Sequence, residues 1–109
     1  MMRELLTSLA DAMAGSDPVK SKAAMLQMAQ DVHGAGAPGQ PKALRSALLK
    51  ELLAIVMSKR PRGVRAHAAR LVGYIGSKSD DKALARLAAD HEIKTDIQMA
   101  RERLRRGAG

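Results

Sequence analysis

The stretch V-R-A-H-A-A-R-L-V-G-Y-I-G, residues 64–76, has the pattern of a helix packed among other helices. Four apolar side chains recur at the i, i+4, i+7, i+11 spacing that defines one helical face: Val64, Ala68, Leu71 and Ile75. Three small residues occupy the other faces: Ala66, Ala69 and Gly73. We expect a neighbouring helix or a ligand to approach closely over these small residues, and the rest of the chain to pack around this segment.

The composition around this stretch favours an all-α fold. The chain has 109 residues, which is one domain's worth and enough for one core. It contains no Phe, no Trp and one Tyr, while Ala, Leu and seven Met supply the apolar volume. These residues, with Lys, Arg and Gln, are strong helix formers, and the residues that favour strands are scarce.

The absence of cysteine removes disulfides, thiolate metal sites and cysteine nucleophiles, and it favours a reducing compartment. No apolar run approaches the ~20 residues needed to span a bilayer. The N-terminal segment places Glu4 beside Arg3 and has a broken apolar run, which argues against a signal peptide. We therefore expect a cytoplasmic protein without a membrane span.

The net charge of +8 is concentrated in the C-terminal two-thirds of the chain. Residues 1–41 carry three Lys/Arg against four Asp/Glu, or −1, whereas residues 42–109 carry sixteen against seven, or +9. A basic field of this kind attracts nucleic acid, acidic protein patches or anionic membrane surfaces.

Residues 1–33 are expected to form a helical hairpin. The first helix runs from about Met2 to Ala14 and stops at Gly15, and Ser16 or Asp17 caps a second helix that has Pro18 in its first position and extends to about His33. Residues 34–41, G-A-G-A-P-G-Q-P, should interrupt the helices. This segment is either a mobile linker or a surface loop; we prefer the loop, because the first two helices alone make too small a core.

Residues 42–106 are expected to form two further hairpins. A helix over residues 42–58 has the widest apolar face and is predicted to be the most buried, and the turn K-R-P-R-G, residues 59–63, leads to the helix of residues 64–76. Ser77 or Ser79 then starts a helix to about Ala89 with Asp80 and Asp81 in its first turn. A last helix covers about residues 92–106, before a frayed tail at residues 107–109.

A weak internal repeat relates these two hairpins. Leu53 and Val56 match Leu84 and Leu87 at a spacing of 31 residues. The apolar stripe of residues 64–75 matches a second stripe at a spacing of 29 residues: Ile93, Ile97, Ala100 and Leu104.

The segment G-V-R-A-H-A-A-R-L-V-G-Y-I-G followed by D-D-K-A-L-A-R-L-A-A-D resembles the short HEAT repeats of the phycobilisome-lyase type. The residues that match the V-R-x-x-A-A-x-x-L/V-G-x-I-G pattern are Val64, Arg65, Ala68, Ala69, Val72, Gly73, Ile75 and Gly76, with Leu84 and Leu87 following. The resemblance covers roughly residues 44–105. The second unit departs from it, with Lys94, Glu102 and Arg103 in the places of Arg65, Gly73 and Tyr74, as in a polar end repeat.

The resemblance implies a right-handed stack of antiparallel helical hairpins with about six helices, whose second helices line a concave surface. Such repeats most often recognise proteins. Some relatives bind nucleic acid, and some of these are DNA glycosylases with longer chains. A fold alone does not carry a function across.

Eight polar residues form the predicted partner-binding surface: Lys59, Arg60, Arg62, Arg65, Lys94, Gln98, Arg101 and Arg105. The last four follow helical spacing along one side of the final helix. Because Arg65 and Lys94 are equivalent in the repeat, we expect them to point the same way and to form a ridge. The alternative is that all eight are simply solvated side chains.

The sequence favours binding over catalysis. It has no G-x-S-x-G turn, phosphate-binding loop or H-E-x-x-H motif, so no catalytic residue and no cofactor are predicted. The run Asp90-His91-Glu92 reads better as a capping turn than as metal ligands, so no metal site is predicted either. The third hypothesis is an enzyme of the lyase or glycosylase kind. The absence of a recognisable set of catalytic residues in the sequence argues against it.

The leading hypothesis is a non-enzymatic HEAT-like module that binds an acidic protein partner through its last helix and the helix of residues 64–76. The alternative is a nucleic-acid backbone binder that uses the same ridge, although Tyr74 is the only aromatic platform for bases. A homo-oligomer formed through the first helix is a further hypothesis.

Overall fold

The computed structural model describes residues 2–35, 37, 39–76, 80–87 and 92–106. Within these residues the ordered elements are helices, and no strand occurs: α1 Met2–Met13, α2 Pro18–Ala35, α3 Lys42–Met57, α4 Arg62–Ile75, α5 Asp81–Leu87 and α6 Lys94–Arg105. The all-α prediction is confirmed. The predicted caps Ser77 and Ser79, the run Asp90-His91 and the frayed tail lie outside the described residues.

The start of α2 follows the prediction from the sequence. One carboxylate oxygen of Asp17 accepts hydrogen bonds from the backbone N–H groups of Val19 at 2.9 Å and Lys20 at 3.2 Å, so Asp17 is the N-cap. The end of α2 was predicted wrongly, because the helix continues through Gly34 to Ala35. Ala35 is buried in the core, and this packing outweighs the weak helix propensity of the glycine.

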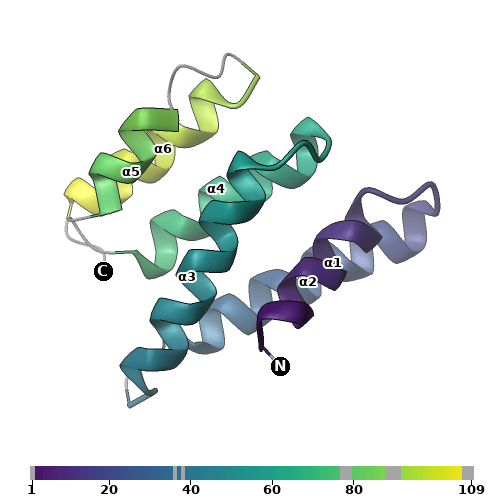
Figure 1. Ribbon diagram of the computed structural model, residues 1–109, viewed down its shortest axis with the longest axis horizontal. Coiled ribbons are helices and arrows are strands. Elements are labelled where there is room, and N and C mark those ends of the chain that lie inside the picture. The colour runs from purple at the N-terminus through teal and green to yellow at the C-terminus, as the bar shows by residue number, and fades with distance from the viewer. Residues whose placement is uncertain (1, 36, 38, 77–79, 88–91, 107–109) are drawn as a thin grey trace.

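The helices lie in two layers (Figure 1). In this view α1, α3 and α5 form the nearer layer, and α2, α4 and α6 form the farther one. Each helix of the nearer layer packs against its successor in the chain, and α4 contacts both α2 and α6. The segment from which the sequence analysis began therefore lies between the N-terminal and C-terminal hairpins.

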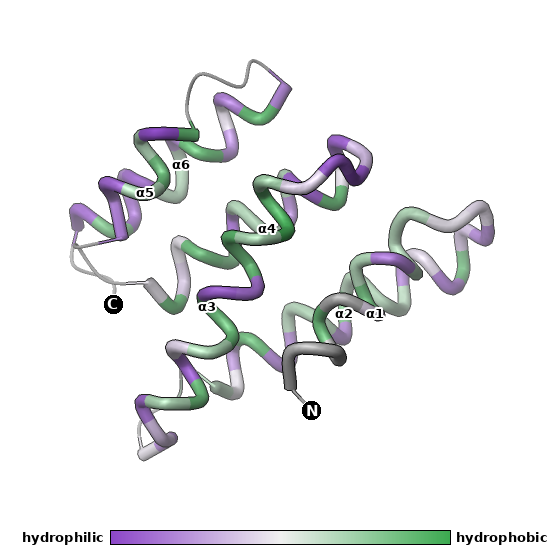
Figure 2. The backbone as a smooth tube through the Cα atoms, viewed as in Figure 1, coloured by the Kyte–Doolittle hydropathy of each residue, from purple (hydrophilic) through white to green (hydrophobic). Residues whose placement is uncertain are grey.

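The helix most deeply buried is α4, and the prediction that α3 would be so is wrong. Eight of the fourteen residues of α4 are buried, against five of the sixteen residues of α3. Both helices contact three others, and the difference lies in the small residues of α4, because Ala66, Ala69 and Gly73 are buried along with its apolar stripe. Figure 2 shows hydrophobic stretches along α3 and α4, in the middle of the view, and a hydrophilic run at the turn that joins them.

The small residues of α4 permit a close helix crossing. A Cβ atom added at Gly73 would lie 3.0 Å from the Cα and 3.3 Å from the Cβ of Ala100 on α6. Ala66 and Ala69 are also buried. At Gly73 the close approach is made by a neighbouring helix, one of the two occupants expected there, and this crossing sets the relative orientation of α4 and α6.

Candidate functional site

The turn between α3 and α4 carries the first group of predicted binding residues, and its arginines reach outward to both neighbouring hairpins. The Nε–H of Arg60 donates to Oδ1 of Asp11 on α1 over 3.1 Å. The backbone N–H of Arg60 donates to Oγ of Ser58 over 3.3 Å, which shapes the turn itself. Arg60 therefore attaches this turn to the N-terminal hairpin.

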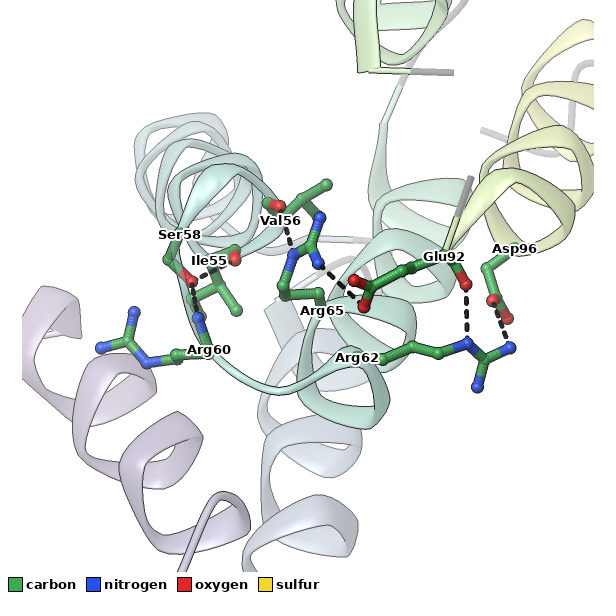
Figure 3. A network of polar contacts seen from close by, with 8 residues as sticks. All are labelled: Ile55, Val56, Ser58, Arg60, Arg62, Arg65, Glu92 and Asp96. Atoms are coloured by element: carbon green, nitrogen blue, oxygen red, sulfur yellow. Dashed lines mark hydrogen bonds and ion pairs between the residues drawn. The ribbon is translucent and has the colours of Figure 1, made fainter. Parts of the chain in front are cut away.

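Arg62 and Arg65 attach the same region to the C-terminal hairpin (Figure 3). The Nε–H of Arg62 donates to the carbonyl oxygen of Glu92 over 2.6 Å, and its Nη2 lies 4.0 Å from Oδ2 of Asp96. The Nε–H of Arg65 donates to the carbonyl oxygen of Val56 over 3.1 Å, and its Nη1 lies 3.7 Å from Oε2 of Glu92.

These contacts give the arginines a part in holding the hairpins together. The side chain of Arg65 is only 12% exposed, so its hydrogen bond to Val56 is shielded from water. The ion pairs of Arg60 and Arg62 involve partly or largely exposed side chains, for which contributions of about 0–1 kcal/mol are usual. Lys59, in the same turn, is exposed.

In the predicted stripe on α6, two side chains are exposed to solvent and two donate hydrogen bonds within the chain. Lys94 and Gln98 are exposed, whereas the Nε–H of Arg101 donates to Oδ1 of Asp81 on α5 over 2.7 Å. Arg105 donates to the carbonyl oxygen of Arg101 over 3.4 Å. Five of the eight predicted residues thus make contacts within the chain, and Arg65 is directed toward α3 while Lys94 is open to solvent.

The Arg101–Asp81 pair changes the acidity of both groups. The hydrogen bond from Arg101 lowers the pKa of the Asp81 carboxyl below its ordinary value, and it raises the pKa of the Arg101 guanidinium. Asp81 lies in the first turn of α5, as predicted, so the pair joins the start of this helix to α6. This contact was not foreseen from the sequence.

A groove between α4 and α6 forms a second basic surface. It encloses about 410 Å³, a volume within the range of small-ligand and side-chain pockets. Its lining residues come from both helices: Arg70, Tyr74, Met99, Ala100, Glu102, Arg103 and Arg106. Arg70 and Tyr74 are four residues apart on α4, and Met99, Arg103 and Arg106 share one side of α6, so helical spacing directs them to the same place.

Two residues of the groove, Tyr74 and Arg103, belong to an aromatic and cationic cluster. The Cζ of Arg103 lies 4.1 Å from the centroid of the Tyr74 ring, in a cation–π contact. The ring of His33 on α2 lies 4.6 Å from the same ring, centroid to centroid, at an interplanar angle of 44°. Three helices of the farther layer therefore meet at Tyr74.

The other two arginines of the groove have loose partners. Nε of Arg70 lies 3.5 Å from Oδ1 of Asp96, and Nη2 of Arg106 lies 3.6 Å from Oε2 of Glu102. Glu102 is the single acidic residue among the lining residues and Asp96 lies beside Arg70, so three guanidinium groups face two carboxylates. The groove thus combines a positive field with the exposed apolar side chains of Met99 and Tyr74.

The sequence analysis did not select this groove. Arg103 entered it only as a departure from the repeat, and Tyr74 only as an isolated aromatic residue. The available signal was the helical spacing of Arg70 with Tyr74 and of Met99 with Arg103. That spacing becomes informative only when the two helices are known to cross beside Gly73.

His67 supports the packing of α2 on α4. Its Nε2 lies 3.1 Å from the carbonyl oxygen of Met25, and the half-buried ring donates this bond when Nε2 carries the proton. Burial lowers the pKa of His67 below that of a free imidazole, and the nearby charge of Arg70 acts in the same direction. The imidazole thus serves as a packing and hydrogen-bonding group.

The described part of the chain contains no group of three or more His, Asp or Glu side chains arranged to hold a metal ion. Within the same residues, no helix combines the length and the hydrophobicity that a membrane crossing requires.

The comparisons with known proteins returned no relative. No protein-family model, no curated protein and no solved structure matches the chain.

Proposed function

We propose that this protein is a non-enzymatic interaction module of the HEAT-like type, which binds an acidic protein partner through the surface formed by α4 and α6. In this proposal, residues 42–76 and 77–106 are two repeats in a right-handed stack, and residues 1–33 contribute the hairpin before them. The position of α4 between α2 and α6 supports such a stack. The motif residues also agree with it, because Gly73 lies at the crossing with α6.

The observation that carries the binding function is the groove at Tyr74. Tyr, Met and Arg are the residue types enriched at protein interfaces, and here they line one concave surface. Its excess of guanidinium groups over carboxylates favours an acidic partner. Lys94 is also exposed on α6, on a side of the helix away from the groove, and its charge adds to the overall positive field of the molecule.

This proposal gives the arginines of the α3–α4 turn a different role from the one predicted. Arg60, Arg62 and Arg65 support the arrangement of the hairpins, and their charges contribute mainly to attracting an acidic partner from a distance.

The test is a comparison of two classes of ligand by fluorescence anisotropy. Labelled acidic peptides and labelled single-stranded and duplex nucleic acids are titrated with the protein at about 50 and 200 mM salt. We expect the acidic peptides to bind, Arg103→Glu to abolish binding, and Lys50→Glu to preserve most of it. Lys50 is the matched control, because it is exposed on α3, in the other layer.

Two results would overturn this function. Failure of every acidic peptide to bind at the lower salt would reject it. Preferential binding of nucleic acid, with an affinity that falls by orders of magnitude between the two salt concentrations, would replace it with the nucleic-acid alternative.

A further inference from the structure

The groove between α4 and α6 exposes two large apolar side chains, one from each helix. Tyr74 is 43% exposed and Met99 is 56% exposed, and both line the same cavity. An unbranched methionine adapts its shape to a partner, and a tyrosine ring offers a rigid wall. This pair can receive one apolar side chain from a ligand.

The cations around these two residues have donors to spare. The contacts of Arg70 with Asp96 at 3.5 Å and of Arg106 with Glu102 at 3.6 Å are longer than the 2.7 Å contact of Arg101 with Asp81. Each guanidinium carries five N–H donors in a planar fork that fits a carboxylate in a bidentate manner. Arg70 and Arg106 therefore retain N–H groups that an anionic ligand can use.

Glu102 occupies the place that a ligand carboxylate would take. It lines the cavity, its side chain is 61% exposed, and its pair with Arg106 is an i, i+4 contact on the helix surface. Such exposed pairs are weak, so an incoming carboxylate can displace Glu102 from Arg106.

The same features favour a peptide over a nucleic acid. Glu102 would repel a continuous run of phosphates more strongly than a peptide whose carboxylates are separated by neutral residues.

We infer that the groove binds a short acidic peptide segment in which one apolar side chain is flanked by carboxylates. The apolar side chain packs between Tyr74 and Met99, and the carboxylates pair with Arg70 and Arg106, releasing Glu102. This inference rests on the proposed function, and it specifies the chemistry of the partner at that surface.

The experiment uses the intrinsic emission of the protein. The chain has one tyrosine and no tryptophan, so Tyr74 reports directly on the groove. The protein is titrated with two peptides that lack aromatic residues: a glutamate and glycine peptide with one central leucine, and the same peptide with alanine in place of leucine. We expect the leucine peptide to bind about tenfold more tightly, because it buries more apolar area.

Three variants locate the two parts of the interaction. Met99→Ala should remove most of the preference for leucine, and its exposure means that this truncation leaves the core intact. Glu102→Gln should tighten the binding of both peptides by about two- to fivefold, because the internal competitor is removed. Lys50→Ala, on the other layer, should change neither quantity.

The outcomes separate this inference from the function on which it rests. Equal binding of the two peptides would overturn the apolar anchor while leaving an acidic-partner module in place. Weaker binding to Glu102→Gln would overturn the displacement of that carboxylate. If neither peptide binds and a labelled nucleic acid does, both the inference and the proposed function are rejected.

Discussion

The α3–α4 turn and the α4–α6 groove contain similar residues and use them differently. Next to the turn, at the start of α4, Arg62 and Arg65 donate to backbone carbonyl oxygens of other segments, over 2.6 and 3.1 Å. In the groove, Arg103 lies over an aromatic ring and Arg106 pairs loosely with an exposed carboxylate. In the proposed function, the partners of each guanidinium group, and not positive charge alone, distinguish the candidate binding surface from the supporting contacts.

The difference follows from where hairpins meet. Helix ends and turns present carbonyl groups without intrahelical partners, and an arginine nearby can satisfy them. Arg45 acts in the same way, since its Nε–H donates to the carbonyl oxygen of Ile75 over 2.5 Å at the end of α4. Along the sides of α4 and α6, Arg70 and Arg105 reach carbonyl oxygens of their own helix only, over 3.5 and 3.4 Å. The guanidinium groups there otherwise face solvent or aromatic and carboxylate side chains.

The largest expected effect concerns the crossing beneath the groove. Gly73→Ala places a Cβ 3.0 Å from the backbone of Ala100, which must shift, so we expect the free energy of unfolding to fall by about 1–3 kcal/mol. Gly63→Ala is the matched control in the turn region of the same helix, where no neighbouring atom lies within 4 Å. It should gain roughly 0.5–1 kcal/mol, because alanine is the better helix former. Urea denaturation measures both, and equal changes would contradict the described crossing.

The next effect tests the structural role of the turn. Arg65→Met keeps the length of the side chain but removes the charged donor to the Val56 carbonyl, and it should cost about 1–2 kcal/mol of unfolding free energy. Lys94→Met, at the position that the proposed repeat pairs with Arg65, should stay within about 0.5 kcal/mol of the wild type. If both variants lose the same unfolding free energy, Arg65 does not stabilise the fold more than the exposed Lys94, which contradicts its structural role.

A pH titration of stability tests the contact between α2 and α4. The pKa of His67 is lower in the folded protein than the 6.5 of a free imidazole, so the unfolded chain binds its proton first as the pH falls. The stabilisation is therefore present above pH 6.5 and is lost as the pH falls through the folded pKa. His67→Gln retains an N–H donor without titrating, and it should flatten this part of the curve. An unchanged slope in that variant would contradict the assignment.

A second pH effect belongs to the Asp81–Arg101 pair and appears at lower pH. Because Arg101 lowers the pKa of Asp81 below 3.8, the stabilisation is present above that value and is lost as the carboxyl is protonated in the folded state. Asp81→Asn should remove the part of the acid-induced loss that falls below pH 3.8, as measured by thermal melts across this range. Identical acid profiles for the variant and the wild type would rule out the pair as a contributor.

The smallest expected change in stability is at the groove itself. Arg103→Ala removes an exposed cation–π contact worth about 0.5–1 kcal/mol or less, so the unfolding free energy should scarcely change. The emission of Tyr74 should nevertheless change, because the charge over its ring is gone. A large loss of stability would mean that Arg103 supports the fold as Arg65 does.

Local patterns in the sequence were sufficient for most of the fold. Helical periodicity and terminal residues predicted the helices, and the cap at Asp17 was confirmed in detail. The extent of α2 was missed because the burial of Ala35 depends on tertiary contacts that local propensity does not contain. The greater burial of α4 over α3 was missed for the same reason, since it depends on how the small residues of α4 pack in the folded protein.

The candidate site was harder to predict than the fold. The sequence analysis identified the basic character of α4 and α6, but it could not tell which arginines would find acceptors within the chain. Arg62 and Glu92 are 30 residues apart, as are Arg45 and Ile75. The groove depends on the way α4 and α6 cross at Gly73 and Ala100, which no single-helix pattern determines.

The most direct test of the central claim is a chemical-shift map of the isotope-labelled protein titrated with the leucine-bearing acidic peptide. The account predicts that the largest changes fall on the groove, at Arg70, Tyr74, Met99 and Arg103, and that the resonances of Arg62 and Arg65 move little. Changes centred on residues 59–65 would contradict it, and would indicate that the partner binds at the turn between α3 and α4 instead.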